Sequence, residues 1–163
     1  MRIGGIRNEE LPQLIEMRDA AAKGEKNDYE AQLDSYIEDL CDYYGYSSDE
    51  AIYIEDAFNG GLSAEQIKCV ENVFEYLDYE AGRVIIEAFK EGADIERVEK
   101  FMVYATDRIT DNAAWDVAWA IRENRSDEWI EALLSTCTNP HKYSKVKAAL
   151  ESGVAPSEAV KAA

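Results

Sequence analysis

The feature that most constrains the fold is a residue pattern that recurs four times between residues 48 and 163. Each copy holds an apolar residue, then an alanine followed by a large apolar residue, then a turn and a position for a capping residue. Successive copies are offset by 31, 32 and 29 residues, counted between Ala57, Ala88, Ala120 and Ala149. A period of this length is typical of arrays in which each repeat is a pair of helices. We therefore expect four stacked helix-turn-helix units.

The repeated positions have separate physical explanations. The turn residue is one that tolerates the left-handed backbone at a helix end, and the four copies place Gly61, Gly92, Asn124 and Gly153 there. A residue able to cap the next helix follows two positions later in three copies, as Ser63, Asp94 and Ser126. The fourth copy has Ala155 at the cap and begins its helix with Pro156 instead. Such a departure is common in the terminal repeat of an array.

Two further helices are expected before the array. Apolar residues spaced for one helix face run from about residue 9 to residue 23, and again over residues 28–44, where Gly45 is the expected stop. The inward side chains of the second helix are Leu33, Tyr36, Ile37, Leu40 and Tyr44. With only three prolines, the composition also favours helices. We predict an all-α fold within a single domain, residues 1–163: a two-helix bundle (1–47) leading into an α-solenoid-like array of four repeats (48–163).

The repeat pattern resembles the short helical repeats found in uncharacterised proteins of bacterial mobile elements and their phages. The resemblance covers residues 48–163 and includes Tyr104-Ala105 followed by another helix. It implies a helical-repeat fold and a mobile-element or phage setting, and it supplies no catalytic residue.

The location of the protein is also constrained by its sequence. No apolar run approaches the roughly 18 residues that a membrane span needs, and the first residues do not resemble a signal peptide. Cys41, Cys69 and Cys137 are odd in number and lack a Cys-x-x-Cys spacing, so we expect free thiols and neither disulfide nor zinc site. We expect a cytoplasmic protein with no membrane partner.

Negative charge is concentrated in one part of the chain. The formal net charge is −17, and the 53 residues from Asp28 to Glu80 hold fifteen acidic residues and one basic residue, Lys68. Direct binding to nucleic acid normally requires a basic surface, so we expect none. The acidic segment instead creates a potential that attracts a basic partner. The alternative is a solvated face that only promotes solubility.

Carboxylates recur every four residues between residues 28 and 44, at Glu30, Asp34, Glu38 and Asp42. On a helix this spacing forms one line, with a rise of about 6 Å per step. A second line, expected opposite an apolar face, comprises Glu71, Glu75 and Asp78. Tyr43 and Tyr44 are either core residues or interface anchors beside the first line. The candidate partner-binding residues are Asp34, Glu38, Asp42, Tyr43, Tyr44, Glu50, Glu55, Asp56, Glu71, Glu75 and Asp78.

The residues that carry chemistry in other proteins are scarce or wrongly spaced. His141 is the only histidine, which excludes multi-histidine metal sites. The segment from Asp107 to Asn112 lacks the central glycine and second ligand of a calcium loop, and the chain has no glycine-rich phosphate loop. Trp115 and Trp119 are four residues apart on one expected helix, with Trp129 on the next, and aromatic residues at helical spacing are usually core residues, so we expect the three tryptophans in the core. We therefore expect neither enzymatic activity nor a cofactor or metal, although carboxylates buried together in a cleft would indicate an enzyme.

Two functions follow from these observations. The first is a non-enzymatic acidic protein that occupies a basic groove as a nucleic-acid mimic, for instance an anti-CRISPR or antirestriction inhibitor of a CRISPR effector or restriction nuclease. The second is a helical-repeat scaffold that binds a protein on its concave face, with its acidity serving solubility.

Overall fold

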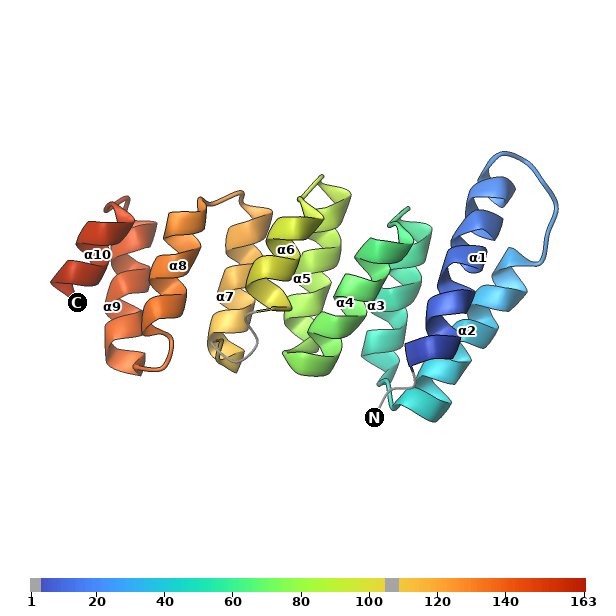
Figure 1. Ribbon diagram of the computed structural model, residues 1–163, viewed down its shortest axis with the longest axis horizontal. Helices are drawn as coiled ribbons and strands as arrows, with labels where there is room; N and C mark the ends of the chain where they lie inside the picture. Colours follow the sequence, from blue (N-terminus) through green and yellow to red (C-terminus); the bar gives the residue numbers. More distant parts are fainter. Residues whose placement is uncertain (1–3, 105–108) are drawn as a thin grey trace. The chain divides into compact units, whose positions relative to one another are not determined.

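The computed structural model describes residues 4–104 and 109–163, which form ten helices and no strand (Figure 1). The all-α prediction is confirmed. Ala105 of the repeat motif and Asp107 lie outside the described residues. The chain divides into two compact units, Met1–Lys68 and Cys69–Ala163, which are described separately below. The expectation of a single domain over residues 1–163 stays a prediction.

The first unit contains α1 (Gly4–Ala22), α2 (Tyr29–Tyr44), α3 (Ser48–Asn59) and the start of α4 (Ala64–Tyr76). α2 packs against both α1 and α3. The core of this unit includes the fully buried Leu40, Ile54 and Phe58, and the ring of Phe58 meets Tyr36 edge to face at 5.5 Å. On α2, Leu33, Tyr36 and Leu40 are buried as expected, whereas Ile37 and Tyr44 are half-buried.

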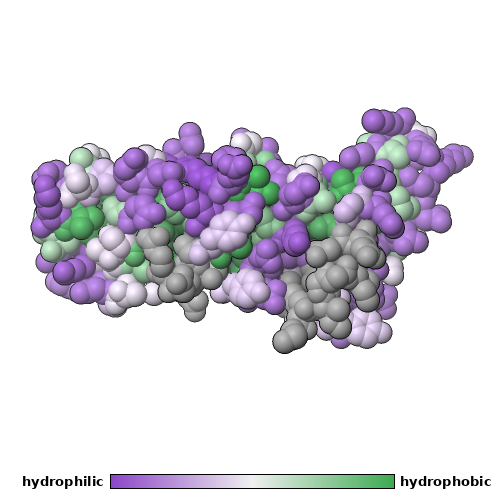
Figure 2. Space-filling view, in the orientation of Figure 1, coloured by the Kyte–Doolittle hydropathy of each residue, from purple (hydrophilic) through white to green (hydrophobic). Residues whose placement is uncertain are grey.

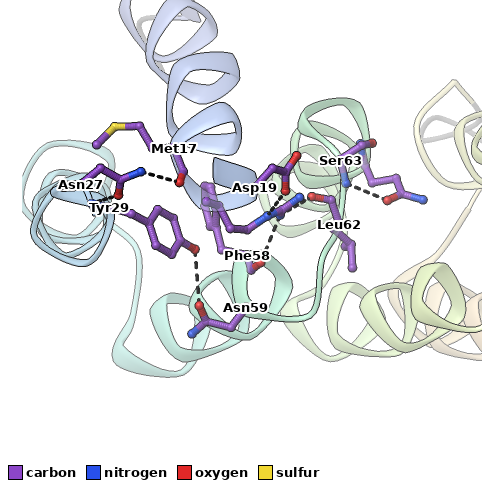
Figure 3. Close-up of polar contacts among 10 residues, drawn as sticks. Met17, Asp19, Asn27, Tyr29, Phe58, Asn59, Leu62 and Ser63 are labelled. Carbon is purple, nitrogen blue, oxygen red and sulfur yellow. Dashed lines mark hydrogen bonds and ion pairs between the residues drawn. The ribbon is translucent and has the colours of Figure 1, made fainter. Parts of the chain in front are cut away.

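The side chain of Arg18 links α1 to the end of α3 and the turn after it; its two acceptors there, Phe58 and Leu62, are labelled in Figure 3. The Nη1 atom of Arg18 donates to the carbonyl oxygen of Leu62 at 2.6 Å and to that of Phe58 at 3.1 Å. These carbonyls belong to a helix end and its turn, where acceptors lack a partner within the helix. Hydrogen bonds from a charged donor are among the stronger ones in proteins, so Arg18 fixes the first helix onto the first repeat.

All four repeat turns share one backbone structure. The turn residue has a positive φ in each copy, as predicted: 86° at Gly61, 96° at Gly92, 59° at Asn124 and 96° at Gly153. In the second copy, Gly92 N–H donates to the carbonyl of Phe89, and Ala93 N–H donates to that of Ala88. The equivalent two bonds close the other three turns. This pair of bonds defines a Schellman motif, which satisfies carbonyls at the helix end.

The caps that follow these turns differ between copies. Ser63 and Gln66 form the reciprocal capping box, with nitrogen–oxygen distances of 2.9 and 3.2 Å. Ser126 Oγ accepts from Trp129 N–H at 3.2 Å. Asp94 stands at the cap position of the second copy but its side chain makes no capping hydrogen bond. The sequence pattern thus predicts where each helix begins, but does not settle whether the side chain caps it.

The second unit contains the rest of α4 and six more helices. These are α5 (Tyr79–Lys90), α6 (Ile95–Met102), α7 (Asp111–Arg122), α8 (Asp127–Thr136), α9 (Pro140–Glu151) and α10 (Pro156–Ala162). The first helices of neighbouring repeats pack together as α5 on α7, and the second helices as α8 on α10 (Figure 1). Contacts of like helices between neighbours are the packing of a helical-repeat array.

The core of the second unit is formed by the inward faces of these helices. Ile85, Phe101, Val117, Ile130 and Leu133 are almost completely buried. Of the repeated alanines, Ala88 and Ala120 are buried, whereas Ala149 in the last repeat is partly exposed. None of the helices among the described residues has the length and apolar character to span a membrane.

Candidate functional site

The carboxylate line on α2 lies on the solvent side of the first unit. Asp34, Glu38 and Asp42 are all exposed, opposite the buried Leu33 and Leu40. No cation within the described residues pairs with any of these three carboxylates. Like charges four residues apart on a helix repel by a few tenths of a kcal/mol per pair. The line therefore slightly destabilises α2 and leaves its charge available to a partner.

The three tyrosines after this line have different environments. Tyr43 is 79 % exposed, Tyr44 is half-buried, and Tyr46 is buried. Tyr46 N–H donates to the carbonyl of Leu40, and this bond helps to close the end of α2 at Gly45, whose φ is 73°. Tyr43 is thus the tyrosine placed to contact a partner, and Tyr46 belongs to the core.

The acidic residues of α3 have divided roles. Glu55 and Asp56 are exposed, and Ile52, one turn before them, is an exposed apolar side chain at 59 %. Glu50 is half-buried, and its Oε1 accepts from Ser47 N–H at 3.2 Å, while Ser47 Oγ accepts from Glu50 N–H. Glu50 therefore helps to begin α3, a structural role that the sequence analysis did not assign to it.

The expected second line, in the other unit, is not a uniform surface. Glu75 is exposed, Asp78 is half-buried just before α5, and Glu71 is buried at 5 % exposure. The expectation that Glu71 faces solvent is wrong, because α4 buries a wider arc than its apolar set suggested. Cys69, Val70 and Val73 are buried beside it. A buried carboxylate cannot meet a partner's surface, so the line is reduced to Glu75 and Asp78.

The tryptophans depart from the expectation of core packing. Trp115 is 42 % exposed, while Trp119 and Trp129 are half-buried. All three line a cavity of about 190 Å³ between α7, α8 and α9. Helical spacing predicted that the tryptophans of α7 share a face, but not that the face borders a cavity.

A second hollow runs along the second helices of the repeats. Residues of α6, α8 and α10 line an open groove of about 710 Å³, among them Lys100, Asp127, Ala132, Val160 and Lys161. Val160 is an exposed apolar side chain there, at 38 %. Sequence periodicity gives no signal for this groove, because it depends on how successive repeats are stacked.

Potential metal ligands and surface hydropathy give no further candidate site among the described residues. No group of three potential metal ligands is present in residues 4–104 and 109–163. His141 is exposed in the first turn of α9, where the sequence placed it. Hydrophilic residues cover most of the face drawn in Figure 2, and the hydrophobic areas visible there are small and separate.

Comparison with known proteins gives no relative from which a role could be transferred. No protein family, curated protein or solved structure matches the chain.

Proposed function

We propose that this is a non-enzymatic binding protein that engages a basic protein surface through the exposed acidic face of its first unit. The observation that carries the proposal is the α2 line of Asp34, Glu38 and Asp42, which is exposed and has no cation paired with it among the described residues. Glu55 and Asp56 add two exposed carboxylates on α3. A dense negative field of this kind accelerates encounter with a basic partner and selects against acidic ones.

The basic surface that we propose is a groove that normally holds nucleic acid. Rigid helices carrying carboxylates at steps of about 6 Å present a row of fixed negative charges, as a phosphate backbone does. The exposed Tyr43 and Ile52 lie next to this charge in sequence, and an aromatic or apolar anchor is typical of a protein–protein interface. With the resemblance to mobile-element repeats, this favours an inhibitor of a CRISPR effector or restriction nuclease.

A second candidate function is a scaffold that binds a protein segment in the groove along α6, α8 and α10. The volume of that groove, about 710 Å³, and the exposed Val160 favour it. In this case the acidity of the first unit serves solubility, and binding depends on apolar contact. The two functions differ in their response to salt, because screening weakens exposed charge pairs and leaves apolar contacts nearly unchanged.

The test is capture of a nuclease from a lysate that contains CRISPR effectors and restriction enzymes. Capture is measured at about 0.1 M and about 1 M salt, between which the Debye length falls from about 10 Å to about 3 Å. The test variant combines Asp34→Asn, Glu38→Gln and Asp42→Asn. We expect a nuclease to be captured at low salt, and capture to be lost at high salt and in the variant.

A matched variant controls for net charge. Asp94→Asn, Glu96→Gln and Glu158→Gln remove the same number of charges from exposed positions in the second unit, and this variant should capture the nuclease as the wild type does. Equal loss in both variants would mean that total charge matters and the α2 face does not. Capture that persists at high salt and in the α2 variant would overturn the proposal in favour of the groove.

A further inference from the structure

The end of α3 carries the one Asn-Gly sequence in the chain, Asn59-Gly60, and both residues are exposed to solvent. In such a pair the backbone nitrogen after the asparagine can attack the side-chain amide carbon, because glycine has no Cβ to hinder the approach. The chain has six other asparagines, and each is followed by a residue with a Cβ. Asn59 is therefore the most reactive asparagine of the sequence wherever its backbone is free to move.

The reaction converts the side-chain amide to an acid in two steps. The nitrogen of Gly60 loses its proton to solvent base and bonds to Cγ of Asn59, and the Cγ–Nδ2 bond breaks as the amide nitrogen takes up a proton and leaves as ammonia. Water then opens the resulting cyclic imide at either carbonyl. One opening gives aspartate. The other gives isoaspartate, in which the main chain runs through the side-chain carbon.

The fold restrains both reacting groups. Gly60 N–H donates to the carbonyl of Asp56 at 2.7 Å in the last turn of α3, so its proton is withheld from base. Asn59 is the last residue of α3, and closure of the imide ring requires its backbone to leave the helical ψ. Its side-chain oxygen accepts from the hydroxyl of the buried Tyr29 at 3.4 Å (Figure 3). The reaction therefore requires the end of α3 to open.

Arg18 opposes that opening. Its Nη1 donates to carbonyls on both sides of the Asn-Gly pair, that of Phe58 at 3.1 Å and that of Leu62 at 2.6 Å (Figure 3). The side chain of Arg18 is only 13 % exposed, and hydrogen bonds from a charged donor are among the stronger ones in proteins. Opening the turn breaks both bonds, so it costs more free energy than the fraying of an ordinary helix end.

We propose that Asn59 is a latent deamidation site, whose conversion to aspartate or isoaspartate is restrained by the contacts of Arg18 and then weakens those contacts. Isoaspartate adds one main-chain atom between the two carbonyls that Arg18 holds. Either product places a carboxylate at the C-terminal end of α3, where the helix dipole disfavours negative charge. The new carboxylate also stands four residues after Glu55, on the same helix face, and so adds to the exposed negative charge of the first unit.

Mass spectrometry of the digested protein measures the modification, as the gain in mass when an amide becomes an acid. The whole protein is incubated at pH 8, native and in guanidinium chloride, and Asn124, which is exposed and followed by arginine, serves as the internal comparison. We expect Asn59 to react before Asn124 in guanidinium chloride, and at least about tenfold more slowly in the native protein. Asn59 reacting no faster than Asn124 in guanidinium chloride, or equally fast in both conditions, would overturn the proposal.

Variants test the restraint by Arg18. Arg18→Gln should raise the native rate at Asn59 about tenfold, the equivalent of one charge-assisted hydrogen bond, and leave the rate in guanidinium chloride unchanged. Arg18→Lys keeps a charged donor, so it should give a smaller rise and replaces Arg18→Gln if circular dichroism shows that variant to be unfolded. Arg83→Gln is the matched control, because Arg83 pairs with Glu80 in the second unit. An unchanged native rate in the Arg18 variants, or the same rise in Arg83→Gln, would overturn the role of Arg18.

The modified protein should be less stable than the unmodified one. Anion exchange separates the two, because the product has one more negative charge. We expect the urea midpoint to fall on modification of the wild type, and to fall less on modification of Arg18→Gln or Arg18→Lys, where the contacts that the product weakens are already reduced. An equal fall in the wild type and the Arg18 variant would overturn the link between Asn59 and Arg18.

Discussion

The Nε atom of Arg97 lies 2.8 Å from Oδ1 of Asp127, across a sequence separation of 30 residues. Arg122 and Glu91 are separated by 31 residues and approach to 2.9 Å. Both separations match the repeat period, so the same kind of ion pair joins one repeat to the next. Arg97 also donates to the carbonyl of Arg125 in the turn before α8. Polar contacts between repeats thus accompany the apolar packing of like helices.

We expect Asp127→Asn to lower stability in a pH-dependent way. Hydrogen bonds from Arg97 and, less strongly, Lys100 hold the pKa of Asp127 below its usual value. A lowered pKa contributes stability that is present above the unfolded pKa of about 3.9 and is lost as pH falls through the folded pKa. Because the side chain is 47 % exposed, the loss at pH 7 should be below about 1 kcal/mol. Urea unfolding should show it at pH 7 and not at pH 2.

Glu128→Gln is the matched control for that experiment. Glu128 is the next residue in the first turn of α8 and is exposed, so it shares the helix-dipole contribution of Asp127 without the ion pair that Asp127 makes with Arg97. A loss in Glu128→Gln equal to that in Asp127→Asn would assign the effect to the helix end and contradict the role of the pair between repeats.

The caps of neighbouring repeats should differ in energy although their sequence positions match. Ser126→Ala removes an oxygen that accepts from Trp129 N–H, and should destabilise the protein by about 1 kcal/mol. Asp94 makes no such bond, so Asp94→Ala should cost less. Thermal unfolding of the two variants side by side measures this difference. A larger loss of stability for Asp94→Ala would contradict a capping hydrogen bond at Ser126 and its absence at Asp94.

At the turn after α5, the backbone conformation alone should disfavour any residue that has a Cβ. Gly92 has a φ of +96°, and a Cβ placed there meets no heavy atom within 4 Å. Gly92→Ala should therefore cost about 1–2 kcal/mol, the penalty of a left-handed backbone for a residue with a Cβ. Asn124→Gly, at the equivalent turn, should cost nothing or stabilise slightly. Denaturant midpoints give both values, and a neutral Gly92→Ala would contradict the predicted backbone strain.

The cysteines should differ in reactivity in the folded protein. Burial raises the pKa of the Cys69 thiol to about 12, so it stays protonated at pH 8. Cys137 is also buried, whereas Cys41 is partly exposed. Iodoacetamide at pH 8 should modify Cys41 alone until the protein is unfolded, as mass spectrometry of the digested protein would show. Rapid modification of Cys69 in the native state would contradict its burial.

The sequence predicts the turns of this fold better than its surfaces. A left-handed residue demands Gly or Asn, so Gly61, Gly92, Asn124 and Gly153 reveal the turns directly. The same turn also closes α1, where Gly24 has a φ of 96° and Glu25 N–H donates to the carbonyl of Ala20. The repeat pattern in the sequence does not reveal this turn, because Ala21 stands where the other copies have a large apolar residue.

Contacts between helices could not be predicted in the same way. Gly82 is buried in α5, and a Cβ there would lie 2.2 Å from the ring of Phe74 on α4. The need for glycine at this position depends on how closely the two helices approach, which no local sequence pattern encodes. The burial of Glu71 and the cavity beside Trp119 have the same origin. Exposure of the α2 carboxylates was predictable, because one amphipathic helix determines which of its faces is buried.

Competition with nucleic acid tests directly whether the α2 carboxylates mimic it. A nuclease captured by the protein is purified and bound to a fluorescent nucleic acid, and the protein is then titrated in at low salt while anisotropy is followed. We expect full displacement by the wild type and at least tenfold weaker displacement, about 1.4 kcal/mol, by the triple variant of Asp34, Glu38 and Asp42. Formation of a ternary complex with nucleic acid still bound would contradict it.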